Sequence, residues 1–92
     1  MKMVSIRIPT PLRNLSSNKE EVEVEGASLA AALDDLERRH PGFKERLMNE
    51  KGALRPYINV FHNDEDVRFA DGLKTALKAG DRLAIVPAIA GG

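Results

Sequence analysis

The segment EVEVEGASLAAALDDLERR, residues 21–39, places an alternating strand directly before an amphipathic helix. Valines alternate with glutamates from Glu21 to Glu25, which is the period of a strand with one face in the core and one in water. Gly26 interrupts this pattern, and Ser28 is a suitable N-cap for the helix that follows. From Leu29 to Arg39 the apolar residues recur at helical spacing. A helix this short is stable only when its apolar stripe packs on a sheet.

A second alternating segment precedes this unit. Residues 4–8, VSIRI, alternate apolar with polar side chains and predict a strand with one buried face. Pro9 and Pro11 end it, because proline cannot donate to a strand ladder. The polar stretch 13–19 predicts a turn. The strands 4–8 and 21–25 are therefore expected to form a hairpin.

Further strands are expected after the helix. Residues 57–62, YINVFH, are rich in β-branched and aromatic side chains and predict a strand. Residues 66–69 are expected to return briefly beside it after a turn, and residues 82–87, RLAIVP, form the last strand. Between the main helix and these strands, residues 43–48 predict a further turn of helix and residues 49–56 a loop.

The order of these elements predicts the fold class. A hairpin followed by a crossover helix and further strands fits an α+β fold with one mixed sheet of four to five strands, covered by one main helix. This is the β-grasp, ubiquitin-like arrangement. A ferredoxin-like fold would need a second full helix, for which residues 73–78 are too short. We expect one β-grasp domain over residues 1–87 and a flexible tail over 88–92.

Composition narrows the function classes. Lysine plus arginine and aspartate plus glutamate each total 14, so the formal net charge is zero and no overall field attracts nucleic acid or an anionic membrane. Cysteine is absent, which excludes thiol nucleophiles, disulfides and thiolate metal sites. The chain shows neither a signal-peptide pattern nor an apolar stretch of about 20 residues that could span a membrane. Cytoplasmic localisation is the expectation.

Candidate catalytic and metal sites are few. No serine lies in a nucleophile-elbow context, and no phosphate-binding glycine motif occurs. The run His62-Asn63-Asp64-Glu65-Asp66 gathers possible ligands but lacks the spacing of a calcium loop, so a solvated hairpin turn is the favoured interpretation. His40 is explained by the C-terminal end of the helix and His62 by the end of a strand. We therefore expect that the protein is not an enzyme, has no metal site and binds no cofactor itself.

The C-terminal end is the strongest candidate for chemistry. After the last strand come Ala88, Ile89, Ala90, Gly91 and Gly92, all small or apolar. Five residues extend roughly 17 Å, and two glycines make the tip as thin as a polypeptide allows. Such a tip fits a narrow channel and brings its carboxylate to a partner's active site. A terminal Gly-Gly also occurs by chance, so a plain interaction domain with an incidental ending stays open.

One face of the predicted sheet is a candidate docking surface. If Ile58 and Val60 point to the helix, Phe61 points to the opposite face, which no second helix covers. Phe61, joined by Phe69 and Val86, would form an apolar patch suited to a partner protein. The alternative is that a loop covers Phe61.

The chain resembles the ubiquitin-like sulfur carriers, a family that includes the small subunit of molybdopterin synthase and the mycobacterial carrier for cysteine biosynthesis. The segments that carry the resemblance are residues 57–61, 63–69, 80–81 and 85–92. The run NDEDVRF at 63–69, the ending PAIAGG and the long loop before Tyr57 resemble the cysteine-biosynthesis branch most. The likeness spans essentially the whole chain. His62 departs from the apolar residue expected in much of the family.

This resemblance implies a function. A ubiquitin-activating-type enzyme would adenylate Gly92 with ATP, and a sulfur source would convert it to a thiocarboxylate. In the nearest branch, a pyridoxal-phosphate cysteine synthase would consume the sulfur, and a metalloprotease would cleave the resulting adduct. ATP and pyridoxal phosphate would belong to these partners. The open alternatives are a molybdopterin synthase small subunit, another thiolation carrier, or a ubiquitin-like modifier conjugated through Gly92.

Overall fold

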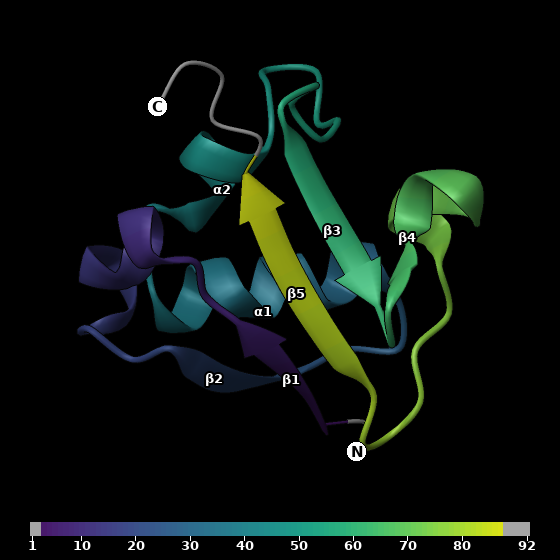
Figure 1. Cartoon of the computed structure of the whole chain (residues 1–92), viewed down its shortest axis with the longest axis horizontal. Coiled ribbons are helices and arrows are strands. Elements are labelled where there is room, and N and C mark those ends of the chain that lie inside the picture. The colour runs from purple at the N-terminus through teal and green to yellow at the C-terminus, as the bar shows by residue number, and fades with distance from the viewer. Residues whose placement is uncertain (1–2, 88–92) are drawn as a thin grey trace.

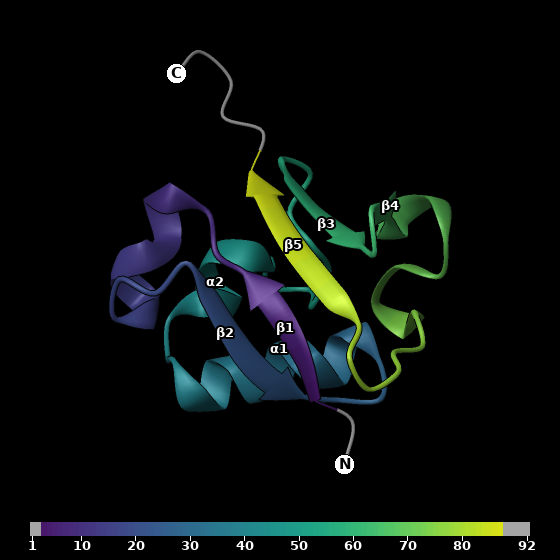
Figure 2. The same cartoon turned by 60° about the horizontal axis from the view of Figure 1, so that its bottom comes forward.

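One mixed sheet of five strands organises the computed structural model, which describes residues 3–87 (Figure 1). The strand order is β2-β1-β5-β3-β4; β1 and β5 are parallel and the other neighbouring pairs are antiparallel. Helix α1 crosses one face, as the views in Figures 1 and 2 show. This is the β-grasp architecture that the sequence predicts. The elements are β1 Met3–Arg7, η1 Thr10–Ser16, β2 Glu21–Glu25, α1 Leu29–Arg39, α2 Phe43–Leu47, β3 Ile58–His62, β4 Glu65–Asp66, η2 Val67–Phe69, η3 Gly72–Lys74 and β5 Arg82–Pro87, where η marks a 3-10 helix.

The core lies between α1 and the sheet. The predicted hairpin is confirmed, with Ile6 opposite Val22 in the register of β1 and β2, and both side chains are buried. Ser28 caps α1 as predicted, since its hydroxyl accepts a hydrogen bond from the Ala31 amide at 3.2 Å. The helix turns its apolar stripe onto the sheet. The buried apolar residues of α1 are Leu29, Ala32, Leu33 and Leu36.

A buried carboxylate ties α1 to the end of β2. Asp35 accepts a hydrogen bond from the Glu25 amide at 2.8 Å and from Nε of Arg39 at 2.6 Å, and it also pairs with Arg38. Burial raises the pKa of Asp35, but these hydrogen bonds outweigh it and lower the pKa to about 2. The Asp35 carboxylate therefore stays ionised inside the protein, because both of its oxygens accept hydrogen bonds.

The polar turn expected over residues 13–19 is mostly wrong. A 3-10 helix, η1, occupies Thr10–Ser16, because Leu12 is buried against the core and Leu15 packs at its edge. Ser16 is also buried, and its hydroxyl donates to the Lys19 carbonyl at 2.7 Å. The three-residue spacing of the two leucines was the signal for this turn of helix.

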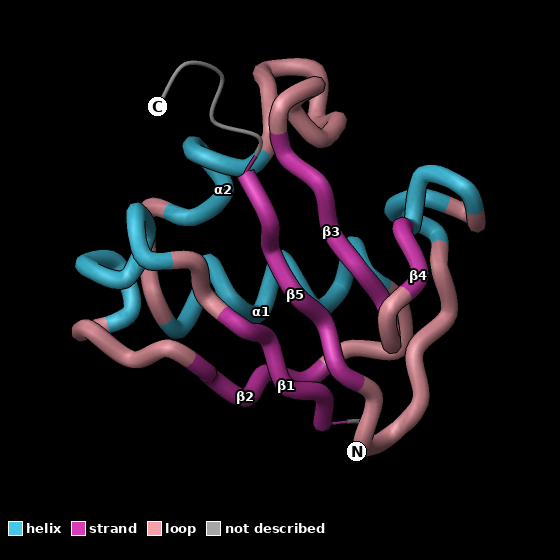
Figure 3. Tube along the Cα trace, in the orientation of Figure 1, coloured by secondary structure: helices cyan, strands magenta, loops and turns pink. Residues whose placement is uncertain are grey.

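The brief strand expected over residues 66–69 does return beside β3, but it begins one residue earlier and is shorter. Strand β4 covers only Glu65–Asp66, and the chain then enters η2 (Figure 3). The Asp66 carboxylate accepts a hydrogen bond from the Arg68 amide at 2.9 Å, which caps the 3-10 turn and ends the pairing with β3. The expected loop before β3 and the short helix α2 are present.

Candidate functional site: the open sheet face and the root of the C-terminal tail

The last described residue of the chain, Pro87, ends the central strand of the sheet. In the register of β3 and β5, Pro87 lies opposite Ile58 and Val86 opposite Asn59. Pairing with β1 reaches only as far as Ala84, so the end of β5 is held by β3 alone. The predicted site residues Ala88, Ile89, Ala90, Gly91 and Gly92 lie outside the described residues. The structure therefore defines only the platform to which they are attached, namely the paired end of β5 and start of β3.

Arg68 holds the start of β3 beside that platform. Its guanidinium donates hydrogen bonds to the carbonyls of Arg55 and Ile58, each at 2.7 Å, and to the Pro56 carbonyl at 3.0 Å. It also reaches Oδ1 of Asn59 at 3.2 Å. One side chain thus satisfies three carbonyls where β4 no longer pairs with β3.

The face of the sheet opposite α1 carries part of the predicted docking patch. Ile58 and Val60 are buried toward α1, whereas Phe61 lies on the other face, half-buried and opposite Ala84. Val86 is 44% exposed on β5, two residues from Ala84. Phe61 and Val86 thus share one face.

Phe69, the third predicted member of the patch, belongs to a different element. It is 87% exposed on η2, which follows β4 at the edge of the sheet (Figure 1). Tyr57, just before β3, is a further exposed aromatic residue that the predicted patch did not include.

Residues 6–92 match the ThiS family. The match covers nearly the whole chain, from the end of β1 through α1 to Gly92. The chain belongs to the ThiS family. Its mixed sheet and single main helix are the fold that the family resemblance implied.

Relatives of this ThiS-family chain match most or nearly all of its length. Sulfur carrier protein CysO of Mycobacterium tuberculosis is 44% identical over 91 residues, which are 97% of this chain and 98% of the relative. A chain in the crystal structure of the Amycolatopsis orientalis BexX/CysO complex is 48% identical, with a TM-score of 0.91 over 97% of this chain and 99% of that one. Small archaeal modifier protein 1 of Haloferax volcanii is 39% identical over 77 residues, covering 83% and 84% of the two chains.

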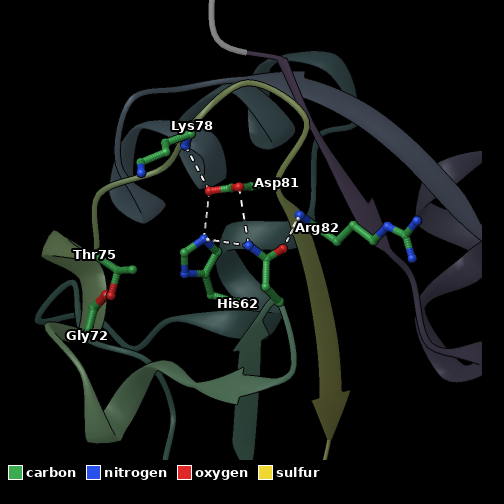
Figure 4. A network of polar contacts seen from close by, with 7 residues as sticks. His62, Gly72, Thr75, Lys78, Asp81 and Arg82 are labelled. Atoms are coloured by element: carbon green, nitrogen blue, oxygen red, sulfur yellow. Dashed lines mark hydrogen bonds and ion pairs between the residues drawn. The ribbon is translucent and has the colours of Figure 1, made fainter.

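A polar cluster lies at the C-terminal end of β3. It includes His62, which stands where an apolar residue is expected in much of the family. His62 Nε2 lies 2.7 Å from Oδ2 of Asp81, which also accepts the Lys78 amide at 2.8 Å (Figure 4). Asn63 donates to Oδ1 of the same carboxylate at 3.2 Å. The sequence did not reveal this pairing, because 19 residues separate the two partners. The cluster joins the β3–β4 turn to the start of β5.

The favoured interpretation of residues 62–66 as a hairpin turn is confirmed. His62 pairs with Glu65 across a two-residue turn in which Asn63 and Asp64 have φ of 49° and 76°. Asparagine and aspartate tolerate this left-handed conformation, which matches the twist of a tight hairpin. Across the described part of the chain, no group of three acidic, histidine or cysteine residues is placed to hold a metal. None of its helices is long and apolar enough to cross a membrane.

Asp81→Asn is expected to reduce the loss of stability in acid. Pairing with His62 is the main cause that lowers the pKa of Asp81 from 3.8 to about 2, so the folded state favours the ionised carboxylate. This stabilisation is present above about pH 4 and is lost as the pH falls through about 2. It amounts to about 2 kcal/mol. Urea unfolding between pH 2 and 5 should show a smaller decline in the variant, although Asp35 still titrates. An equal decline in both proteins would contradict the assignment.

Proposed function

We propose that this chain is a sulfur carrier whose C-terminal Gly92 is converted to a thiocarboxylate. The observation that carries the proposal is the full-length likeness to proteins named sulfur carriers, at 44% identity, in a chain that ends in Gly91-Gly92. The fold contributes a fixed starting point for the tail at Pro87, in the central strand of the sheet. The tail residues 88–91 would thread a partner's channel and place the carboxylate of Gly92 in its active site.

The proposed chemistry belongs to partner enzymes. In an activating-type enzyme, a carboxylate oxygen of Gly92 attacks the α-phosphate of ATP, pyrophosphate leaves, and an acyl-adenylate forms. Sulfide then attacks the carbonyl carbon and AMP leaves, which yields the thiocarboxylate. A persulfide would instead give an acyl disulfide, and a thiol of the partner would have to reduce that disulfide to release the thiocarboxylate. The chain supplies the reacting carboxylate and no catalytic group, so it acts as a co-substrate. ATP and pyridoxal phosphate would be bound by the partners.

Cysteine biosynthesis is the proposed use of the sulfur. The likeness to CysO and the resemblance of the ending PAIAGG to that branch support it. The accepting partner would be a pyridoxal-phosphate cysteine synthase, and a metalloprotease would release the product from the adduct. Delivery to molybdopterin synthase or to another thiolation pathway is the alternative within the same chemistry.

We propose that the open sheet face docks on the activating-type enzyme. Phe61→Ala is expected to weaken binding about tenfold, because a buried aromatic contact is typically worth more than 1 kcal/mol at an interface. Phe61 is only half-buried and lies outside the core, so the melting temperature should change little. Isothermal titration with the activating-type enzyme measures the affinity. An unchanged dissociation constant would remove Phe61 from the interface, and the same test applies to Val86 and Phe69.

A ubiquitin-like modifier is the second candidate function. The 39% identity to small archaeal modifier protein 1 favours it, since the same tail and the same activation would serve conjugation. The difference lies in the acceptor, which is a lysine amine of another protein instead of a sulfur nucleophile. Isopeptide-linked conjugates of Gly92, found by mass spectrometry of cell extracts, would support this function.

The intact mass of the protein purified from its own cells tests the sulfur-carrier proposal. Purification must avoid conditions that hydrolyse thioacids. A species heavier by one exchange of oxygen for sulfur, located in the C-terminal peptide, is the expected result. A single unmodified mass that persists after incubation with ATP, sulfide and the cognate activating-type enzyme would refute it.

A further inference from the structure

A hollow of about 390 Å³ lies on the open face of the sheet. Two arginines from neighbouring strands, Arg7 on β1 and Arg82 on β5, line it together with the aromatic ring of Phe61. Neither arginine was part of the predicted docking patch. The residues that line the hollow are Arg7, Glu21, Phe61, Asn63, Asp64, Arg82, Leu83 and Ala84.

The strand register builds this hollow. Arg7 lies opposite Ala84 across the parallel β1–β5 pair, and Ala84 lies opposite Phe61 across the antiparallel β3–β5 pair. The small side chain of Ala84 therefore lies between the larger Arg7 and Phe61 and forms the floor of the hollow. Arg82 is two residues before Ala84 on the same face, and its side chain extends from β5 toward β1 (Figure 4).

Both guanidinium groups are available to a partner. Arg7 and Arg82 are exposed, and among residues 3–87 no carboxylate lies within ion-pair distance of either. Other arginines are used by the fold, such as Arg39 on Asp35 and Arg68 on the start of β3. An arginine fork binds a carboxylate with two parallel hydrogen bonds, so two unused forks around one hollow suit an acidic group.

The acidic residues of the hollow lie at its two sides. Glu21 comes from β2, beyond Arg7, and Asp64 comes from the β3–β4 turn, beyond Phe61. The strand order thus puts positive charge in the middle and negative charge on either side. This pattern, with a net charge of zero, disfavours a phosphate backbone, which would meet both carboxylates. It fits a protein surface with a central acidic side chain and basic side chains around it.

We propose that this hollow receives an aspartate or glutamate side chain of the activating-type enzyme, held between Arg7 and Arg82 above Ala84. The inference rests on the proposed function, because that function supplies the partner. Phe61 forms one wall and excludes water from the ion pair, which strengthens it. This ion pair would add a charged contact to the apolar docking face and would fix the orientation in which the partner binds.

The double substitution Arg7→Gln with Arg82→Gln tests the proposal. Its affinity for the cognate activating-type enzyme, measured by isothermal titration, should fall about tenfold to a hundredfold, as expected for hydrogen bonds to charged groups. The remaining binding should also depend less on salt. The matched control is Lys19→Gln with Lys74→Gln, which removes the same charge from exposed positions outside the hollow and should bind as the wild type does. Equal affinity of both double variants would overturn the proposal.

Two further variants separate the carboxylate pairing from other effects. Arg7→Lys with Arg82→Lys keeps the charge but loses the fork, so it should recover only part of the affinity, and full recovery would overturn bidentate recognition. Ala84→Met fills the floor of the hollow on an open sheet face and should weaken binding with little loss of stability. Wild-type affinity for Ala84→Met would place the partner's contact elsewhere.

The proposal and the function on which it rests fail in different ways. If the wild-type chain binds the enzyme and acquires sulfur while the Arg7/Arg82 variant does so equally well, only the hollow is refuted. If the wild-type chain never acquires sulfur, the carrier function is refuted. Amide shifts of Arg82 and Ala84 that differ between residues 1–87 and the full chain would assign the hollow to this chain's own terminal carboxylate, which would also overturn the proposal.

Discussion

Removing Gly91 and Gly92 is expected to abolish thiocarboxylate formation while leaving the free energy of unfolding unchanged. The deletion takes away the carboxylate that is to be adenylated and shortens the maximum reach of the tail by about 7 Å. Stability should be retained because every core side chain of the described structure lies between Val4 and Ile85. Incubation with ATP, sulfide and the activating-type enzyme, followed by intact mass measurement, reports loading.

The control for this deletion keeps the length of the tail and changes only its thickness. Gly91→Val retains the terminal carboxylate but adds a β-branched side chain next to it, so loading should be strongly reduced if the tip enters a narrow channel. Thermal melting should be the same for all three proteins. A deletion variant that still acquired sulfur would refute Gly92 as the reacting residue.

Gly26→Val is expected to destabilise the protein by about 3 kcal/mol or more, the upper end for overpacked interiors. A Cβ at Gly26 would lie 2.5 Å from the Ala32 amide nitrogen and 2.8 Å from its Cα, both backbone atoms of α1. The helix cannot yield without moving off the sheet, because Leu29 and Leu33 anchor it in the core. Glycine at this position thus allows the chain just after β2 to pass close to the backbone of α1 at Ala31 and Ala32.

Chemical denaturation with Ala27→Val as the control measures this effect. Ala27 is the next residue along the chain and is exposed, so the added methyl groups meet solvent and the change should stay within about 0.5 kcal/mol. Comparable stability of the two variants would mean that α1 can shift to make room. Gly26→Ala should give an intermediate loss.

The sequence predicted the fold where hydrophobic periodicity is strong and local. The alternation in residues 21–25 and the helical spacing in Leu29–Arg39 both reappear in the structure with the expected faces buried. The segments that were predicted wrongly are short and depend on single contacts. Thr10–Ser16 became helical through the burial of Leu12, and Val67–Phe69 left the sheet through the cap at Asp66.

Some residues of the candidate site were predicted from the sequence, and others are apparent only in the structure. The proposed reacting end, Gly91-Gly92, rests on the sequence alone; it lies outside the described residues and stays a prediction. Phe61 was assigned to the open face from strand alternation alone. Arg7 and Arg82, and the pairing of His62 with Asp81, were not foreseen, because they depend on which strands become neighbours.

The sequence by itself therefore determined the long strands and helix α1, their inward and outward faces, and the glycine tip. These properties follow from side-chain period and backbone freedom over a few residues. Only the tertiary structure decided that β5 lies between β1 and β3, in a register that sets Ala84 between Arg7 and Phe61. Pairing between residues 77 apart in β1 and β5 is selected by the burial of the whole core, since a shift of one residue would turn every inward side chain to water.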